Sequence, residues 1–244
     1  SCPLPVAASD GQALRTLAGR PAVIITFLQG LSPRVPNAAQ CREIGIGLAR
    51  LHEAATDFEM KRENSLGPAS WPGLWNGREQ SAEDLQAGLA AKISDDLKAI
   101  AAEESSIRAL PRGTVHADLF PDNAFFLGDR FTGAIDFYFA CTDALAYDLA
   151  VCINAWAFEP DGAFNYSKAA NLIAGYQSVR PLTDAEKSAF PVLCRGAAIR
   201  FFLTRLIDWT DTPADALVKP KDPIDYAARL RFHRTARAFS DYGG

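Results

Sequence analysis

One stretch near the middle of the chain constrains the fold more than any other feature. Residues 114–138 read TVHADLFPDNAFFLGDRFTGAIDFY, a polar loop followed by two short apolar runs. The runs Ala124–Leu127 and Gly133–Phe137 flank a Gly-Asp-Arg turn, which predicts a tight β-hairpin. A hairpin is stiff, so it holds the polar residues at its two ends at a constant separation. We therefore expect a site at this point, with ligands from both sides of the hairpin.

The polar residues of this stretch are those that phosphoryl transfer requires. The loop has the pattern His116-x-Asp118-x4-Asn123, and the hairpin ends in Ile135-Asp136-Phe137. Phosphoryl transfer needs a carboxylate to orient or accept the proton of the attacking hydroxyl, and hard oxygen ligands for Mg²⁺. We predict that Asp118 is the catalytic base and that Asn123 and Asp136 bind the metal. His116 is expected to brace the loop by hydrogen bonding.

The remainder of the chain predicts a mainly helical lobe behind a small β-hairpin, and hence an α+β protein. The hairpin is expected over Gln12–Thr16 and Ala22–Leu28, with a buried second strand. Apolar residues at helical spacing predict the helices, one of them interrupted near Pro191. Trp71 and Trp75 are expected to be packing anchors. The predicted helices begin at Asn37 and Ser81 and then cover Asp148–Phe158, Lys168–Gln177, Asp184–Trp209 and Pro223–Phe239.

Composition excludes several classes of protein. The net charge of -4 lacks the basic surplus of a nucleic-acid binder. The five cysteines form no CxxC pair, which argues against zinc and disulfides and for a reducing compartment. No apolar run is long enough to span a bilayer, and residues 1–12 do not resemble a signal peptide. We expect a cytoplasmic protein with a small-molecule substrate and no nucleic-acid or membrane partner.

The pattern of this loop and hairpin resembles the aminoglycoside-phosphotransferase-like branch of the protein-kinase superfamily. That branch has a His at the first motif position and a downstream Asp-Leu-Ala, here Asp148-Leu149-Ala150. Within it, the chain resembles the kinase-fold type of bacterial homoserine kinase. The stretches that carry this closer resemblance are VHADLFPDNAFFLGD, IDFYFACTDALAYDLAVCINAWAFE, AGYQSVRPLT, RGAAIRFFLTRLIDW and DPIDYAARLRFHR.

The resemblance implies phosphorylation of the L-homoserine hydroxyl by ATP and Mg²⁺, a step of threonine biosynthesis. It also implies a two-lobe kinase fold, here a remnant of the nucleotide-binding β lobe (1–28) and a helical catalytic lobe (29–244). Asp148 would brace the catalytic loop, although the residue also fits a plain helix N-cap. The interlobe hinge would lie in the apolar run 24–28, which a plain core strand fits equally. Its adenine-binding backbone would belong to Thr26, Phe27 and Leu28.

A homoserine pocket must pair a carboxylate and an ammonium group. Arg205, on an apolar helix, is the predicted carboxylate partner, and an intrahelical pair with Asp208 is the alternative. The ammonium group has three candidate ligands, and one aromatic residue is expected to line the pocket. These residues are Asp143, Asp208 and Asn154 for the ammonium group and Tyr138 for the lining.

The chain departs from this kinase pattern at its amino end. No Gly-x-Gly-x-x-Gly occurs, no lysine precedes Lys61, and Gly45-Ile46-Gly47 lies within a predicted helix. We expect an amino-terminally truncated member that is weakly active and prone to associate through an unpaired strand edge. Kinases of choline, methylthioribose or aminoglycosides, and a non-catalytic kinase-like binding module, remain as alternatives. Aromatic residues and Arg205, in place of a row of acids, favour a small zwitterion over an aminoglycoside.

Overall fold

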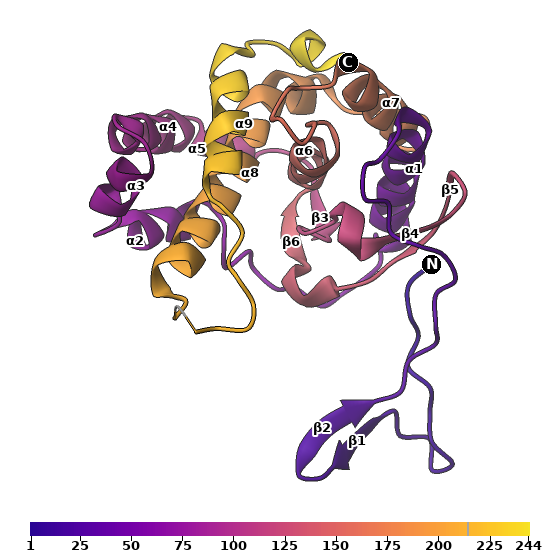
Figure 1. Ribbon diagram of the computed structural model, residues 1–244. Helices are drawn as coiled ribbons and strands as arrows, with labels where there is room; N and C mark the ends of the chain where they lie inside the picture. Colours follow the sequence, from indigo (N-terminus) through magenta and orange to yellow (C-terminus); the bar gives the residue numbers. More distant parts are fainter. Residues whose placement is uncertain (214) are drawn as a thin grey trace.

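The computed structural model describes residues 1–213 and 215–244. It consists of a helical body with three small two-stranded sheets (Figure 1). The helices are α1 (Ala38–Ala54), α2 (Trp71–Trp75), α3 (Glu79–Leu85), α4 (Leu89–Ala102), α5 (Glu104–Arg108), α6 (Leu145–Trp156), α7 (Tyr166–Gln177), α8 (Asp184–Asp211) and α9 (Ile224–Thr235). The strands are β1 (Leu14–Leu17), β2 (Arg20–Val23), β3 (Arg112–Val115), β4 (Ala124–Leu127), β5 (Arg130–Ala134) and β6 (Cys141–Ala144). Within the described part of the chain, no helix combines the length and apolarity needed to cross a membrane.

The amino-terminal hairpin was correctly predicted, but its second strand covers Arg20–Val23 and not Ala22–Leu28, and its burial was wrong. Strands β1 and β2 pair antiparallel across Ala18 and Gly19, both with positive φ, as a tight hairpin turn requires. The hairpin projects from the helical body on a thin stalk (Figure 1), and β2 is exposed apart from one half-buried residue. The expectation of a buried second strand was therefore wrong. Its apolar composition indicated burial, but none of the described residues packs over it.

Helix α1 explains the Gly-Ile-Gly sequence as a packing feature. Asn37 caps the helix through a capping box with Gln40, which confirms the predicted start. The helix lies directly against α7 (Figure 1), and the two approach at glycines. A Cβ on Gly45 would stand 2.1 Å from the carbonyl oxygen of Leu172, and one on Gly175 would stand 2.1 Å from that of Arg42. These glycines permit two backbones to touch.

We expect the variant Gly45→Ala to lower the free energy of unfolding by about 3 kcal/mol or more, because the added methyl overlaps rigid backbone. The measurement is urea unfolding followed by circular dichroism. Gly73→Ala is the matched control, since it is also helical and its Cβ would meet nothing within 4 Å. Equal stability of the two variants would contradict the close crossing of α1 and α7.

Two helix boundaries differ from expectation. The helix predicted from Ser81 is two helices, because Gly88 adopts a left-handed φ of 74° between α3 and α4. Conversely, α8 runs unbroken for 28 residues through Pro191. A proline removes one hydrogen bond, but burial of the apolar faces around it holds the helix together. Trp71 and Trp75 are buried, as predicted.

The other two sheets frame the predicted site. Strand β3 pairs antiparallel with β6, and β4 pairs antiparallel with β5 with a register shift at Phe125/Phe126. The segment 116–123 connects β3 to β4, and residues 135–140 connect β5 to β6. Helix α6 follows β6 directly and is almost entirely buried, as its apolar sequence predicted. The two connections are therefore anchored by the paired strands at their ends and by the buried helix α6.

Candidate active site

The loop between β3 and β4, residues 116–123, is held in a conformation that ordinary residues avoid. Ala117 has a φ of 61°, a left-handed value that is uncommon without glycine. The buried carboxylate of Asp148 compensates for this strain. Its Oδ2 accepts the N–H of His116 at 2.7 Å, and its Oδ1 accepts the N–H of Ala117 at 2.8 Å. The N-cap of α6 is Ala144, so the alternative reading of Asp148 as a helix cap was wrong.

The carboxylate of Asp148 is itself part of a longer hydrogen-bonded chain. His52 Nε2 lies 3.0 Å from its Oδ2, and His52 Nδ1 lies 2.8 Å from the hydroxyl of Tyr176. Arg180 then bonds to that hydroxyl and to Glu186, a buried residue in the first turn of α8. Burial alone would raise the pKa of Asp148, but hydrogen bonds from His52 and His116, with their charge interactions, lower it below its usual range.

His52 is a buried histidine whose partner could not be identified from the sequence. Asp148 lies 96 residues further along the chain. The available signal was a histidine on the apolar face of an amphipathic helix, which needs a polar partner when buried. That signal does not identify the partner.

His116 connects the loop to the second connection. Its Nε2 lies 3.0 Å from the carbonyl oxygen of Ile135, and its Nδ1 accepts the N–H of Asp118 at 3.2 Å. With both ring nitrogens engaged, His116 has the contacts of a bracing residue. Asp136, which follows Ile135, has a φ of 63°, and its side chain is exposed. The N–H of Ile135 bonds to the carbonyl of Asn123, which keeps the two ends of the hairpin together.

Asp118, within this loop, lies beside a residue that was not predicted to belong to the site. The guanidinium of Arg200, from α8, lies 3.3 Å from its Oδ1. Burial raises the pKa of Asp118, and this effect outweighs the opposing charge of Arg200; the nearby Asp136 raises the pKa further. A carboxylate with a raised pKa is a better proton acceptor, which suits a general base.

Asn123 and Asp136 provide the kind of atoms that Mg²⁺ prefers. The amide nitrogen of Asn123 donates to the carbonyl oxygen of Asp118 at 2.9 Å, so its amide oxygen is directed away from that bond. The carboxylate of Asp136 has no hydrogen bond to a described residue. Within the described ranges, no cluster of three or more His, Cys, Asp or Glu could hold a metal alone. One carboxylate and one amide oxygen, completed by phosphate oxygens and water, fit a nucleotide-bound Mg²⁺.

The residues predicted for the acceptor pocket are dispersed over several environments. Arg205 bonds to Asp225 and to the carbonyl of Asp222, both at 3.1 Å, and not to Asp208, which is exposed. Its predicted intrahelical pair with Asp208 is therefore absent from the described contacts. Asp143 is buried and bonds to Asn64, while Arg112 lies 3.2 Å away.

Tyr138 is an exposed member of the predicted pocket residues, with 70% of its surface accessible. Arg62 donates to its backbone carbonyl and lies 5.9 Å from its ring centroid. The neighbouring Phe139 faces Arg200, so the aromatic segment borders the space beside Asp118. No described contact tests whether Tyr138 binds a ligand, and its role stays a prediction.

Asn154 lies fully inside the protein. Its amide nitrogen donates to the carbonyls of Ala150 and Cys194, and its oxygen lies 3.0 Å from His233 Nε2. All of its hydrogen-bonding groups thus have protein partners, which makes Asn154 a connector of α6, α8 and α9. The prediction of Asn154 as an ammonium ligand has no support from this geometry. Its position on an apolar helix was correctly expected to be buried.

The same contacts make His233 neutral and give a pH prediction. Burial, together with the positive charges of Arg195 and Arg229, lowers the pKa of His233 to about 3. Unfolding restores a pKa of about 6.5, so the unfolded state binds the extra proton between these values. Stability should thus fall as pH drops from about 6.5 toward 3, by about 1.4 kcal/mol per pH unit from this group. Urea unfolding of wild type and His233→Gln should show a shallower pH dependence in the variant; parallel curves would contradict it.

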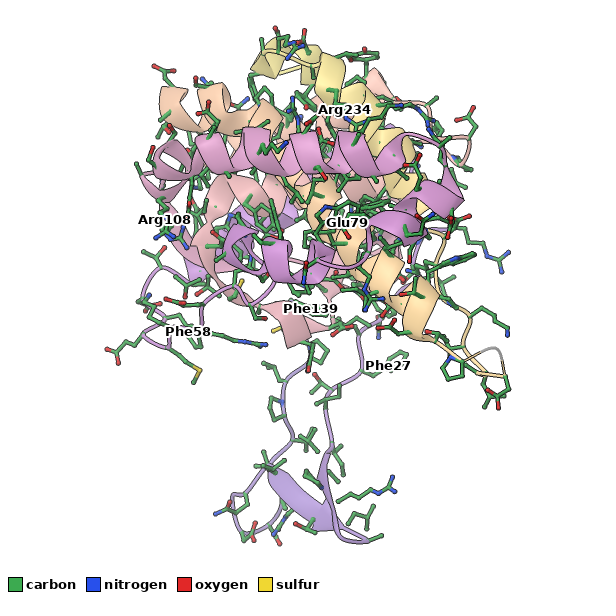
Figure 2. All side chains as sticks on the ribbon, turned by 90° about the vertical axis from the view of Figure 1, so that its left-hand side faces the viewer. Phe27, Phe58, Glu79, Arg108, Phe139 and Arg234 are labelled. Atoms are coloured by element: carbon green, nitrogen blue, oxygen red, sulfur yellow. The ribbon has the colours of Figure 1, made fainter. Side chains whose placement is uncertain are left out.

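The predicted hinge residues lie on the stalk of the amino-terminal hairpin. The N–H of Thr26 donates to the carbonyl of Leu4, and its hydroxyl accepts the N–H of Leu4, both at 2.9 Å. Phe27 is 89% exposed and lies on the stalk (Figure 2), and Leu28 is half-buried. An adenine-binding role for these three residues stays a prediction.

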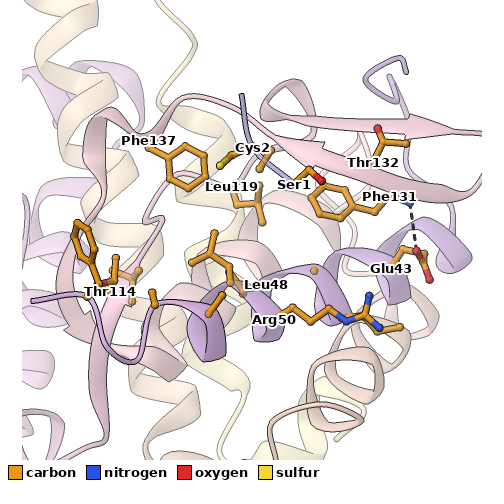
Figure 3. Close-up of a pocket in the computed structure, with 18 of the residues that line it drawn as sticks. Ser1, Cys2, Glu43, Leu48, Arg50, Thr114, Leu119, Phe131, Thr132 and Phe137 are labelled. Atoms are coloured by element: carbon orange, nitrogen blue, oxygen red, sulfur yellow. Dashed lines mark hydrogen bonds between the residues drawn. The ribbon is translucent and has the colours of Figure 1, made fainter. Parts of the chain in front are cut away.

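A cavity of about 830 Å³ lies behind the catalytic loop (Figure 3). It is bounded by α1, by β5 and by the side chains of Leu119 and Phe137, and Glu43 accepts the N–H of Phe131 at its edge. Of the described residues that line it, none is Asp118, Asn123 or Asp136. The cavity is mainly apolar, so it does not form the reaction centre.

Residues 1–182 match the family described as the phosphotransferase enzyme family, and the chain belongs to it. The similarity to curated relatives shows to which branch of this family the chain belongs. The chain is 62% identical to a homoserine kinase of Hyphomonas neptunium, with 99% of this chain and 76% of the relative covered. It is 56% identical to a homoserine kinase of Gluconacetobacter diazotrophicus, with 100% and 76% covered. Within the phosphotransferases, it is thus a kinase of the homoserine kinase family.

Solved structures agree on the fold. An aminoglycoside phosphotransferase from Alicyclobacillus acidocaldarius superposes with a TM-score of 0.67 at 13% identity, covering 98% of this chain and 74% of that one. An ethanolamine kinase from Plasmodium vivax gives a TM-score of 0.59 at 17% identity, covering 96% and 69%. The fold is therefore that of the protein-kinase-like phosphotransferases, as predicted.

Proposed function

We propose that this chain transfers the γ-phosphate of ATP to the side-chain hydroxyl of L-homoserine, giving O-phosphohomoserine for threonine biosynthesis. The observation that carries the proposal is the 62% identity to a homoserine kinase across 99% of this chain. That span includes α6, α8 and α9, the helices next to the catalytic loop. Residues that select an acceptor lie on such elements, so identity there supports a common acceptor.

Asp118 is proposed to receive the proton of the acceptor hydroxyl while the hydroxyl oxygen forms its bond to the γ-phosphorus. The bond from that phosphorus to the β-phosphate oxygen breaks, and ADP leaves. His116 and Asp148 keep the loop in place so that the carboxylate meets the hydroxyl at hydrogen-bonding distance. Mg²⁺ supplies charge neutralisation on the phosphates when bound. Asn123 and Asp136 are the proposed residues that hold it.

The remaining predicted roles form part of the proposal. Residues 1–28 are proposed as part of the nucleotide-binding lobe, with Thr26, Phe27 and Leu28 at the adenine. The acceptor is proposed to lie between the aromatic connection 137–139 and helix α8. Asp143 and Asp208 stay candidate ligands of the ammonium group, with Tyr138 at the rim.

The proposal is tested by a coupled ATP-consumption assay with homoserine, serine, choline and methylthioribose offered in parallel. The assay uses residues 1–244 alone and the same residues joined to the part of the Hyphomonas neptunium homoserine kinase that this chain does not cover (the joined enzyme). We expect turnover with homoserine by the joined enzyme, lost when Mg²⁺ is chelated.

Three results would overturn parts of the proposal. Turnover on choline or methylthioribose alone would replace the acceptor but retain the kinase. Absence of turnover on all four, with no Mg²⁺-dependent nucleotide binding by the joined enzyme, would support a non-catalytic binding module. Turnover unaffected by chelation would exclude the roles of Asn123 and Asp136.

A further inference from the structure

Arg200 is a buried cation placed directly beside the proposed base. It comes from the middle of α8, and only 3% of its side chain is exposed. Its guanidinium carbon lies 3.8 Å from the ring centroid of Phe201 and 5.0 Å from that of Phe139. Contacts with two aromatic rings fix the plane of a guanidinium and lower its hydration, so its remaining donors are directed at one region.

Those donors are largely unused. The only hydrogen bond from Arg200 to a described residue is one from Nη1 to Asp118, at 3.3 Å, which is long for a charged pair. Its Nε and Nη2 have no partner among the described residues, yet they are not among the polar atoms sealed from solvent. These nitrogens therefore keep a small solvent-accessible surface, although only 3% of the whole side chain is exposed. A buried guanidinium with free donors favours an anionic ligand.

The proposed acceptor has an anion at the required distance. In homoserine the hydroxyl oxygen and the carboxyl carbon are four bonds apart, roughly 5 Å when extended. The guanidinium of Arg200 lies 3.3 Å from the carboxylate of Asp118. When the hydroxyl of homoserine bonds to Asp118, the carboxylate of homoserine is therefore within reach of Arg200. We infer that Arg200 binds the carboxylate of the acceptor and so makes the enzyme specific for amino acids over amino alcohols. This inference rests on the proposed function.

Arg205, the residue predicted from sequence for this role, differs in one respect. Its guanidinium is occupied by Asp225 and by the carbonyl of Asp222, and it stacks on Tyr226 at 4.6 Å. These contacts join α8 to the start of α9, and its charge is already balanced by a protein carboxylate. Arg200 instead contacts one oxygen of Asp118, the carboxylate that is proposed to act as the base.

The test compares L-homoserine with 3-amino-1-propanol, which is homoserine without its carboxylate. The quantity measured is the ratio of kcat/KM for the two alcohols in the joined enzyme, for wild type, Arg200→Gln and Arg200→Lys. Any effect of Arg200 on Asp118 applies to both alcohols and cancels in the ratio. We expect Arg200→Gln to lower the ratio by about ten- to a hundredfold, as loss of a charged hydrogen bond predicts. Arg200→Lys, which retains the buried charge, should lose less.

Arg205→Ala is the comparison variant and should retain the wild-type ratio. A ratio unchanged in Arg200→Gln and Arg200→Lys, with both alcohols slowed alike, would overturn the inference and make Arg200 a positioning residue for Asp118. A ratio lost in Arg205→Ala and retained in Arg200→Lys would overturn it in favour of Arg205. If the wild-type joined enzyme does not use homoserine, the proposed function itself is wrong. That result is distinct from any result of the variants, because it is measured on the wild type.

Discussion

Asp118→Asn is expected to lower kcat by about 10²- to 10⁴-fold in the joined enzyme, because the amide cannot accept the proton of the acceptor hydroxyl. Asparagine has nearly the same shape, so the KM for ATP should change little. The loop should also stay in place, since Asp118 contributes to it mainly through its backbone bonds to His116 and Asn123. The measurement is steady-state kinetics at saturating homoserine and ATP.

Asp122→Asn is the matched control. Asp122 lies in the same loop, but its exposed carboxylate contacts only Lys221, at 3.6 Å. Its kcat should stay within about threefold of wild type, as for a surface substitution. If Asp118→Asn and Asp122→Asn lowered kcat equally, the charge of the loop and not the base at Asp118 would account for the effect.

Asp148→Ala is expected to have the largest effect on stability. The substitution leaves the N–H groups of His116 and Ala117 and the ring of His52 without their buried acceptor. We expect the free energy of unfolding to fall by about 3–5 kcal/mol. Ala117 would also be released from its left-handed conformation, which displaces Asp118. A displacement of this kind lowers kcat by about a hundredfold.

Asp96→Ala separates the two effects. Asp96, on α4, is also buried and pairs with Arg234 at 2.6 Å. Its substitution should also cost stability, since it leaves a half-buried arginine without its closest carboxylate. Its kcat under folding conditions should nevertheless stay near that of wild type. Urea unfolding and kcat of both variants provide the measurement, and a kcat loss common to both would show that Asp148 acts through stability alone.

The catalytic loop could be predicted because its geometry is local. Asp118, Asn123 and Asp136 are separated by one turn and one hairpin, and the antiparallel hairpin was predicted correctly. Its first strand was predicted with the observed bounds, but the second strand covers Arg130–Ala134 and not Gly133–Phe137. The start of α1 at Asn37 was likewise predicted from a side chain that bonds within its own first turn. Short-range hydrogen bonds restrict the backbone in ways that the residue order reveals.

The errors arose where long-range packing competes with local preference. The composition of Ala22–Leu28 favours a buried strand, but burial depends on a partner that the run itself does not specify. Pro191 favours a break, and the surrounding buried face of α8 overrides it. Arg200 was missed for a related reason. It stands beside the same aromatic residues as Arg205, and only the fold brings it to Asp118, 82 residues away.

The hydrogen-bonded support of the loop has a consequence for how the chain is made. Asp118 and Asn123 leave the ribosome before the acceptor of the loop N–H groups, which follows 32 residues after His116, and before Arg200, which follows later still. Closing contacts over such separations carries an entropic cost that only the assembled helices offset. The active geometry is therefore among the last features to form. A nascent chain carries the residues for phosphoryl transfer well before it can arrange them.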